Sequence, residues 1–402
     1  MSEKRRDSKG RILHNGEVQK PDGRYRFKYY DSFGKDHYLY SWRLVHTDPI
    51  VPGKKKELSL REKEKQLQMK LMDGLVPNGG NMTVLELVER YVQTRTGVRE
   101  TTKAGYQTVI NFLRKDRFGT RRIDTVSTMD AKLWLIKLQQ TDKKSYSAIH
   151  SIRGVLRPAF QLAFEDDYIK KNPFSFELAT VIVNDSVTRG ALTRTEQRKF
   201  LNFVKEDAHF SRYYDAIFIL FNTGLRISEF VGLTKADIDF KEHKINVDHQ
   251  LMRSTKMEYY IEDTKTECGK RQVPMSPEVE ESFKNILKNR TTPTVEPMID
   301  GYAGFLFLDK NEKPMVALHW EKYFQHICEK YNSIYKVQMP RVTPHVCRHT
   351  FCSNMAKSGM NPKALQYIMG HSEIGVTLNV YTHTNFEDAS EEYQRVNALN
   401  VV

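Results

Sequence analysis

Three kinds of sequence pattern follow one another along the chain, and the changes between them limit the folds it can adopt. Residues 1–80 contain short runs in which basic and aromatic residues alternate, as in strands. Residues 81–185 carry apolar residues at helical spacing almost throughout. After a polar stretch at 183–193, helical and strand-like patterns are mixed. The pattern predicts a multi-domain fold with a small N-terminal β-sheet plus helix domain, an all-α domain, and a mixed, mainly α domain over 186–385.

The net charge is distributed unevenly over these segments. Residues 1–80 hold 18 Lys and Arg against 11 Asp and Glu, and residues 81–190 hold 18 against 12. In the rest of the chain 27 residues of each sign cancel, so the whole formal charge of +13 lies in the first half. A solvated basic surface would explain the excess, but so one-sided an excess more often serves to bind a polyanion. The distribution favours nucleic acid as a partner.

Several other classes of protein fit the sequence poorly. No apolar stretch reaches the 18 residues that a membrane-spanning helix needs. The first residues are charged and lack the apolar region of a secretory signal. Four cysteines in 402 residues do not make a disulfide framework. We therefore expect a cytoplasmic protein without membrane contacts.

The stretch GRYRFKYY at 23–30 offers a first candidate DNA surface. In a strand, its alternation places aromatic side chains on one face and three basic side chains on the other: Arg24, Arg26 and Lys28. Residues 35–44 resemble a second strand, and residues 59–75 a helix. A sheet with one basic face suits a DNA groove. A half-exposed sheet that only keeps the domain in solution fits this segment equally well.

The second segment is predicted to be helical from its first capping box, Thr83 with Glu86. A longer helix is predicted over 145–169, where the apolar residues at helical spacing are Ile149, Ile152, Leu156 and Phe160. Basic residues near the polar side of this helix are the candidate DNA contacts of the domain: Lys143, Lys144 and Arg153, with Arg157 beside them.

The third segment concentrates residues that can do chemistry, above all in TPHVCRHTF at 343–351. Thr343 can cap a helix that begins with Pro344. His345 and Arg348 would then share a face of the first turn, where the backbone amides of a helix start also attract anions. The arrangement suits a bound phosphate. An ordinary helix start without a ligand remains an alternative.

Zinc is a second alternative for the same stretch. His345, His349 and Cys352 follow the i, i+4, i+7 spacing of ligands on one helix face. Against this, Arg348 would stand beside the cation, and neither a C-x-x-C pair nor an acidic base accompanies the stretch.

Further candidates lie on both sides of this helix in the sequence. Downstream, a short predicted helix stops at a glycine that is followed by His371 and, ten residues later, by Tyr381. Upstream, Arg226 follows a helix-ending glycine, and Lys265 falls at the tip of a predicted hairpin. Together these residues are harder to explain by packing than one isolated histidine.

The stretches TGLRISEFVGL, TPHVCRHTFCS and IMGHSEIGVTLNVYTH resemble the signature boxes of the tyrosine recombinases, the integrase family. The resemblance covers roughly 190–385, with the boxes in the expected order. The layout of the whole chain is similar to that of the integrases of conjugative transposons. This similarity implies an arm-type DNA-binding domain at 1–80, a core-binding domain at 81–185 and a catalytic domain at 186–385.

The resemblance also implies a catalytic set, formed by Arg226, Lys265, His345, Arg348, His371 and Tyr381. Tyr381 would attack a phosphodiester and form a 3′-phosphotyrosyl bond, leaving a free 5′-hydroxyl. The arginines would hold the phosphate, Lys265 would protonate the leaving oxygen, and His345 would assist proton transfer from Tyr381. His371 would make a phosphate hydrogen bond. Neither a metal nor ATP is expected, because the phosphotyrosine retains the ester energy.

Partners follow from the same resemblance. It implies core-type and arm-type sites on double-stranded DNA, a homotetramer that passes through a Holliday junction, and accessory excision or DNA-bending proteins. The tail at 386–402 is either a frayed end or a segment that docks into a neighbouring subunit. Two departures from the family pattern are Cys347, where many relatives carry leucine, and a His371-to-Tyr381 interval one residue longer than in some relatives.

Two other functions are set against this one. Residues 359–381 also fit the outline of a helix-turn-helix in a regulator without chemistry, which leaves Arg226 and Lys265 without a role. A type IB topoisomerase would share the phosphotyrosine chemistry but would act as a monomer, and the basic sheet domain argues against it. Within the recombinase interpretation, Tyr367 is the alternative nucleophile. Its place inside a predicted helix suits packing better, so Tyr381 is favoured.

Overall fold

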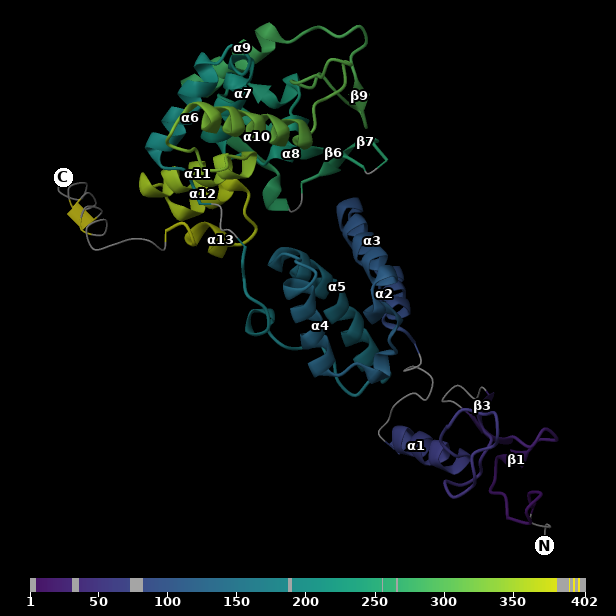
Figure 1. Ribbon diagram of the computed structural model, residues 1–402. Helices are drawn as coiled ribbons and strands as arrows, with labels where there is room; N and C mark the ends of the chain where they lie inside the picture. Colours follow the sequence, from purple (N-terminus) through teal and green to yellow (C-terminus); the bar gives the residue numbers. More distant parts are fainter. Residues whose placement is uncertain are drawn as a thin grey trace. The chain divides into compact units, whose positions relative to one another are not determined.

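The computed structural model of the chain describes residues 5–30, 36–72, 82–186, 190–254, 256–264 and 267–381, with positions 390, 393, 394 and 397. These residues belong to two compact units, Met1–Val187 and Thr188–Val402. The first unit holds a small sheet and then a group of helices, and the second combines helices with short strands (Figure 1). None of the helices in these ranges has the length and apolar character needed to cross a bilayer.

A three-stranded antiparallel sheet opens the first unit, in the order β1-β2-β3. Its strands are β1 (Glu17–Gln19), β2 (Tyr25–Tyr30) and β3 (Asp36–Ser41), and helix α1 (Leu60–Met72) follows. Tyr25, Leu44 and Leu60 are buried together where α1 covers one face of the sheet. On the other face the Arg26 guanidinium lies 5.0 Å from the centre of the Tyr38 ring. The alternation predicted along β2 is therefore confirmed.

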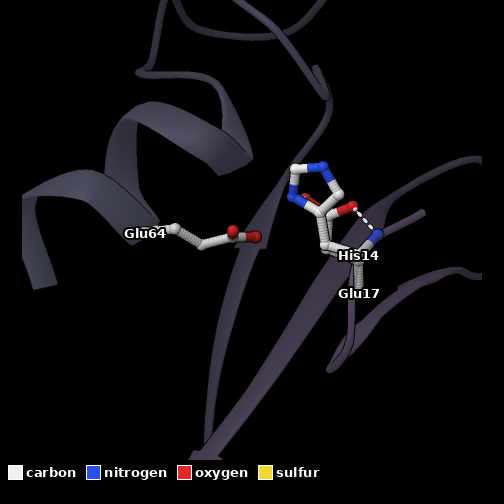
Figure 2. Close-up of side chains that lie close together, drawn as sticks. All are labelled: His14, Glu17 and Glu64. Atoms are coloured by element: carbon white, nitrogen blue, oxygen red, sulfur yellow. Dashed lines mark hydrogen bonds and ion pairs between the residues drawn. The ribbon is translucent and has the colours of Figure 1, made fainter. Parts of the chain in front are cut away.

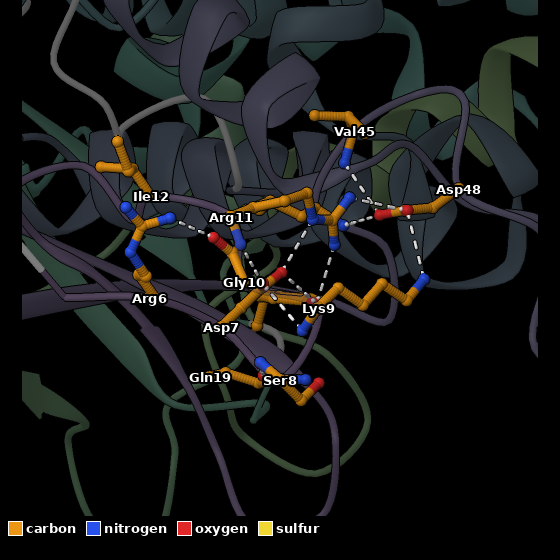
Figure 3. Close-up of polar contacts among 12 residues, drawn as sticks. Arg6, Asp7, Ser8, Lys9, Gly10, Arg11, Ile12, Gln19, Val45 and Asp48 are labelled. Atoms are coloured by element: carbon orange, nitrogen blue, oxygen red, sulfur yellow. Dashed lines mark hydrogen bonds and ion pairs between the residues drawn. The ribbon is translucent and has the colours of Figure 1, made fainter.

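Ion pairs reinforce this small apolar core. Arg11 donates hydrogen bonds to Asp7 and Asp48, each at 2.8 Å (Figure 3). It also donates to the Tyr25 hydroxyl at 3.0 Å. Asp48 also accepts from the backbone of Leu44 at 2.8 Å. Small domains bury too little apolar surface to be very stable, so a polar network that fixes the segment ahead of the sheet adds to their order.

The remainder of the first unit is helical, with α2 (Val84–Gln93), α3 (Glu100–Lys115), α4 (Thr128–Gln140) and α5 (Tyr146–Glu165). The capping box at the start of α2 is present: the Thr83 hydroxyl accepts from the Glu86 amide and the Glu86 carboxylate from the Thr83 amide. The apolar face predicted for α5 is buried, at Ile149, Ile152, Leu156 and Phe160. Helical periodicity alone was sufficient to identify this core.

Arg153 contradicts the pattern predicted for α5. Its side chain does not lie on the polar side of the helix but is buried, and its Nη2 donates to the carbonyls of Phe174 and Phe176. A long side chain can leave the face that its Cα occupies and reach backbone groups in a neighbouring loop. Lys143 is exposed, and the Lys144 ammonium lies 4.5 Å from the centre of the Phe112 ring. The predicted DNA-binding role of Arg153 is therefore not supported by its position.

The second unit surrounds α7 with helices. Its helices are α6 (Arg194–Glu206), α7 (Tyr214–Thr223), α8 (Ile227–Gly232), α9 (Pro277–Asn289), α10 (Ala317–Ile334), α11 (Pro344–Lys357), α12 (Pro362–Met369) and α13 (Ile374–Leu378). Buried α7 packs against α9 and α11, and α12 packs against α11 and β8. The beginnings and ends of α7, α8, α11 and α12 are thereby brought close to one another.

Short antiparallel strands complete the second unit. They are β4 (Ile238–Asp239), β5 (Lys244–Val247), β6 (His249–Arg253), β7 (Tyr259–Asp263), β8 (Arg271–Pro274), β9 (Met298–Ile299) and β10 (Tyr302–Ala303). One sheet has the order β4-β5-β8, while β6 pairs with β7 and β9 with β10. Beyond β6, the Ser254 amide donates to the Glu258 carbonyl at 2.8 Å, which joins the two arms of the β6–β7 hairpin. Lys265, predicted at a hairpin tip, lies outside the described residues.

Candidate active site

Helix α11 begins as its sequence predicts. The Thr343 hydroxyl accepts a hydrogen bond from the Val346 amide at 3.3 Å, and Pro344 is the first helical residue. Arg348 is 5% exposed, and its guanidinium donates to the carbonyls of Gly224 and Met369. The first turns of α11 therefore place the buried Arg348 guanidinium at the junction of α7, α11 and α12.

Three arginines converge on the C-terminal end of α12. Each guanidinium donates to one of three successive carbonyls: Arg271 to Ile368 at 2.6 Å, Arg348 to Met369, and Arg226 to Gly370 at 2.8 Å. The last carbonyls of a helix have no partner within the helix and carry its partial negative charge. The end of α12 thus fixes three side chains that come from distant parts of the sequence.

Two glycines make this convergence possible. Gly224 ends α7 with φ +65° and Gly370 ends α12 with φ +61°, in the left-handed region that favours glycine. A Cβ on Gly224 would lie 2.6 Å from a ring carbon of Phe351, and one on Gly370 would lie 3.0 Å from Nη1 of Arg271. Glycine at 370 therefore leaves room for Arg271 at the end of α12, and glycine at 224 leaves room for Phe351 of α11 to pack against the end of α7.

Glu229 lies among the arginines and is 2% exposed. Its carboxylate accepts from the Arg226 side chain at 2.7 Å and from its backbone amide at 2.9 Å, and from two nitrogens of Arg271 at 2.9 and 3.1 Å. Burial acts to raise the pKa of Glu229, but the bonds from Arg271 and the charge of Arg226 outweigh it, so the pKa is lowered. Three guanidinium groups with one carboxylate leave an excess of positive charge, as an anion site requires.

The excess of positive charge affects the pKa of Arg348. Burial, followed by repulsion from Arg226, lowers the pKa of Arg348 to about 9. The side chain remains a cation at neutral pH, and among the described residues no carboxylate forms an ion pair with it. A bound phosphate would supply the missing negative charge, and guanidinium groups bind phosphate with two parallel hydrogen bonds.

His371 joins this group directly after α12. Its Nδ1 lies 2.9 Å from the Thr377 hydroxyl. Burial, then the charges of Arg348 and Arg226, lower the pKa of His371 to about 4. The imidazole is therefore neutral at pH 7, which suits a hydrogen-bonding role.

The histidines of α11 form a separate pair. His345 is exposed, and its ring lies edge-on to that of His349 with centroids 4.7 Å apart. His345, His349 and Cys352, all of them described, do not bring three ligand atoms close enough to share one ion. The zinc alternative for this stretch is therefore not supported.

Tyr381 rests against the connection between α11 and α12. Its hydroxyl donates to the Met360 carbonyl at 2.7 Å, and the side chain is half-buried. Burial, followed by the nearby Cys352 thiol, raises the pKa of Tyr381. The Tyr381 hydroxyl is thus held by backbone at the connection between α11, which carries Arg348, and α12, whose end binds the arginines.

Tyr367 differs from its predicted environment. Instead of packing into the core, it is 54% exposed and accepts a hydrogen bond from the Gln272 amide at 3.2 Å. The tail at 386–402 falls almost wholly outside the described residues. The structure therefore brings together Arg226, Arg348 and His371 and places Tyr381 against the connection between α11 and α12. His345 lies one turn before Arg348, on the exposed side of α11.

Elsewhere in the described part of the chain, two groups of side chains have the composition of metal sites. His14, Glu17 and Glu64 approach one another between β1 and α1 (Figure 2), but Arg61 already bonds both carboxylate oxygens of Glu17. In the second group, Asp237, Asp248 and His249, both ring nitrogens of the histidine have partners. Neither group therefore supports a metal site.

Two residues of the site were not predicted from the sequence. Glu229 follows Arg226 at the third position of α8, where a capping-box glutamate is favoured, so a local signal existed. Arg271 has no such signal. Its role depends on Glu229 and on the end of α12, both distant in the sequence.

Comparison with known proteins gives matches over the whole chain. Residues 191–388 match the phage integrase family, and residues 1–71 match the DNA binding domain of tn916 integrase. The transposase from transposon Tn916 of Enterococcus faecalis is 46% identical over 398 residues, which cover 99% of this chain and 98% of that protein. The transposase from transposon Tn1545 of Streptococcus pneumoniae matches equally well.

Solved structures agree with these matches. The Tn1549 transposon integrase in complex with a circular intermediate DNA is 43% identical, with a TM-score of 0.74, and covers 78% of this chain and 99% of its own. The same integrase has been solved with transposon right end DNA, at 43% identity and a TM-score of 0.73. A lambda integrase tetramer bound to a Holliday junction, at 16% identity and a TM-score of 0.52, shows a likeness of fold alone.

Proposed function

The chain belongs to the phage integrase family of tyrosine recombinases and is a transposon integrase, and from this premise we propose how its residues break and rejoin DNA. Its fold is that of the tyrosine recombinases, with an N-terminal sheet domain and a mainly helical catalytic domain. A regulator without chemistry and a type IB topoisomerase are not favoured.

In the proposed reaction, Arg226 and Arg348 bind the non-bridging oxygens of the scissile phosphate. Tyr381 attacks the phosphorus, forms a 3′-phosphotyrosyl bond and displaces the 5′-oxygen of the next nucleotide. Lys265 gives that oxygen its proton, and His345 assists proton transfer from Tyr381. Neutral His371 donates a hydrogen bond to the phosphate. The reverse attack by a 5′-hydroxyl from a second duplex completes strand exchange without ATP or a metal.

The convergence of guanidinium groups on the end of α12 carries this proposal. Arg226 and Arg348 are held by backbone carbonyls before any DNA binds, so little reorganisation is needed when negative charge builds up on the phosphate. Tyr381 must release the Met360 carbonyl before it attacks, because its hydroxyl is occupied there. DNA binding would supply the energy for that movement.

The division of labour along the chain is part of the proposal. Residues 1–80 bind arm-type sites through Arg24, Arg26 and Lys28, residues 81–185 bind the core site, and residues 186–385 carry catalysis. Four copies assemble on two duplexes, aided by the tail at 386–402 and by accessory DNA-bending or excision proteins. The enzyme works on cytoplasmic DNA, where its four free cysteines stay reduced.

A covalent-adduct assay tests the proposal. A core-site duplex nicked next to the cleavage position is incubated with the protein in EDTA without ATP. We expect an adduct that survives SDS, that Tyr381→Phe abolishes without loss of DNA binding, and that Tyr367→Phe leaves intact. An adduct that persists in Tyr381→Phe would refute the assignment of the nucleophile. Exchange of strands between two labelled duplexes then distinguishes a recombinase from a topoisomerase.

A further inference from the structure

Arg271 is the most completely bonded arginine of the site. Its side chain has no exposed surface. Nε donates to the Ile368 carbonyl, Nη1 to Gly269 and Glu229, and Nη2 to Glu229, at distances from 2.6 to 3.1 Å. Four of its five N–H groups are therefore engaged by the protein. A guanidinium in this state has almost nothing left with which to bind DNA.

Arg226 is in the opposite state. Its side chain is 34% exposed, and it donates one hydrogen bond to Glu229 and one to the Gly370 carbonyl. Within the described part of the chain, its other three N–H groups have no hydrogen-bond partner and are available to a ligand. The two arginines thus share a carboxylate, but only Arg226 combines that bond with access to solvent.

The shared atom is Oε1 of Glu229, which accepts from Nη1 of both arginines. A buried carboxylate that has a single cationic partner holds that cation tightly, because no water competes for the carboxylate oxygens. Without Arg271, Arg226 would be the one arginine among the described residues that still bonds Glu229. The bonds that hold the carboxylate would then draw the Arg226 guanidinium inward. Arg271 prevents this by satisfying both carboxylate oxygens.

We propose that Arg271 is a positioning residue, which neutralises Glu229 and braces the end of α12 so that Arg226 stays directed at the scissile phosphate. The inference rests on the proposed function, since it assigns Arg271 a role in that reaction. Close packing supports it: a Cβ on Gly370 would lie 3.0 Å from Nη1 of Arg271 and 3.1 Å from the Cys268 carbonyl. The strand that carries Arg271 is therefore interlocked with the helix end that binds Arg226.

The test removes the Arg271 charge and then the charge that it neutralises. Arg271→Met is expected to slow adduct formation on nicked core-site DNA by about 10- to 100-fold, as misplacement of a reacting group does. Adding Glu229→Gln should restore most of that loss, since an amide does not capture Arg226. Because Glu229→Gln also removes a poorly compensated buried charge and so can restore stability, cleavage is compared at a temperature where every variant is folded. A merely structural role would then show no loss of rate in Arg271→Met.

A neutral linkage provides a second readout. In DNA with a methylphosphonate at the scissile position, the arginines have less charge to stabilise. The deficit of Arg271→Met should therefore shrink on this substrate, as should that of Arg226→Ala. On ordinary DNA, the variant that combines Arg226→Ala with Arg271→Met should be no slower than Arg226→Ala alone, because Arg271 acts through Arg226.

Arg290→Met is the matched control. The Arg290 side chain is 4% exposed and bonds Glu296 and the Phe305 carbonyl, which are the same kinds of contact outside the site. It should lower thermal stability without slowing cleavage by folded protein. If Arg271→Met does not fold, Arg271→Gln replaces it, since glutamine also removes the charge but keeps an amide that can donate a hydrogen bond to the Ile368 carbonyl.

The inference is wrong if folded Arg271 variants cleave at the wild-type rate, or if Glu229→Gln does not rescue them. It is also wrong if the deficit is equal on the phosphate and methylphosphonate substrates. Failure of the proposed function would look different, because wild-type protein would then form no adduct that depends on Tyr381.

Discussion

Arg226 and Arg348 donate hydrogen bonds to adjacent carbonyls, those of Gly370 and Met369, at one end of α12. Arg226 is the residue that precedes α8, and Arg348 lies one turn inside α11. Because backbone atoms hold both guanidinium groups, the distance between them is set by a single helix end. This relationship gives each arginine a structural function and would preorganise the pair for the phosphate binding proposed above.

Replacement of Arg348 by lysine should affect both functions. One ammonium cannot bond the Gly224 and Met369 carbonyls and a phosphate with the geometry of a guanidinium. We expect adduct formation to fall by roughly 100-fold or more, about 3 kcal/mol in the barrier. Unsatisfied buried carbonyls should lower the free energy of unfolding by about 1–3 kcal/mol. Single-turnover cleavage and urea unfolding measure the two effects.

Arg341→Lys is the control for this experiment, because Arg341 lies shortly before α11 and is exposed. It should leave both the cleavage rate and the stability close to those of the wild type. Wild-type cleavage by Arg348→Lys would exclude Arg348 from the phosphate site.

The carboxyl pair Glu17 and Glu64 predicts an unusual pH dependence in the N-terminal sheet domain. Burial, then the charge of Glu17, raises the pKa of Glu64 from its ordinary 4.5 to about 8. Between these values the folded domain keeps a proton that the unfolded chain has lost. The contribution of Glu64 to the local stability should therefore be greatest below pH 4.5 and should fall as the pH rises towards 8.

Hydrogen exchange of β2 and α1 measures this effect, as protection factors between pH 5 and 8. Glu64→Gln removes the titrating group and should give protection that changes less with pH and is higher than wild type at pH 8. Glu62→Gln is the control, because hydrogen bonds from Ser59 lower the pKa of Glu62. Equal pH profiles for wild type and Glu64→Gln would contradict the assignment.

Local signals explain most of what the sequence predicted correctly. The caps at Thr83 and Thr343 and the buried face of α5 depend on residues within one or two helical turns, and each is present in the structure. Signals of this kind act through backbone hydrogen bonds and periodicity, which are the same in every fold. Family resemblance added the assembly of distant residues into one site.

The errors and omissions arose where a long side chain meets a distant partner. Arg271 reaches Glu229 and the end of α12, and Arg153 reaches the carbonyls of Phe174 and Phe176. Periodicity gives the direction of a Cβ, but a guanidinium several bonds further on can turn towards any unsatisfied acceptor. Such contacts become visible only once the tertiary structure is known.

The position of Arg153 leads to a third prediction. Arg153→Met removes the donors to two buried carbonyls and should lower the free energy of unfolding of the helical domain by about 1–3 kcal/mol. Arg157, one helical turn later and exposed, should behave in the opposite way. Arg157→Ala should change stability by less than about 0.5 kcal/mol. If Arg157 faces DNA, its loss should weaken core-site binding.

Thermal unfolding and core-site binding of both variants distinguish the two positions. If Arg153→Met folds with unchanged stability but binds DNA more weakly, Arg153 contacts DNA and its structural assignment is wrong. The comparison is informative because the two residues carry the same charge and lie on the same helix.

The basic face of the N-terminal sheet gives the last prediction. Arg24 lies within 5.8 Å of the Tyr40 and Trp42 rings, and Arg26 within 5.0 Å of Tyr38. Guanidinium groups held over aromatic rings are kept at the surface, where they can meet phosphates. Arg24→Ala with Arg26→Ala should weaken binding to arm-type DNA and reduce the slope of log K against log salt by about 2, since each phosphate contact contributes about 0.9.

The matched control removes two charges elsewhere in the same unit, by Arg6→Ala with Lys9→Ala. Arg6 bonds the Gly10 carbonyl and Lys9 pairs with Asp48, and neither residue belongs to β2 or β3. If both double variants lose the same amount of arm-site affinity and salt dependence, only the net charge matters. A larger loss for the Arg24 and Arg26 pair, with core-site cleavage unchanged, locates arm recognition on the sheet, because phosphate contacts depend on where a charge is held as well as on its sign.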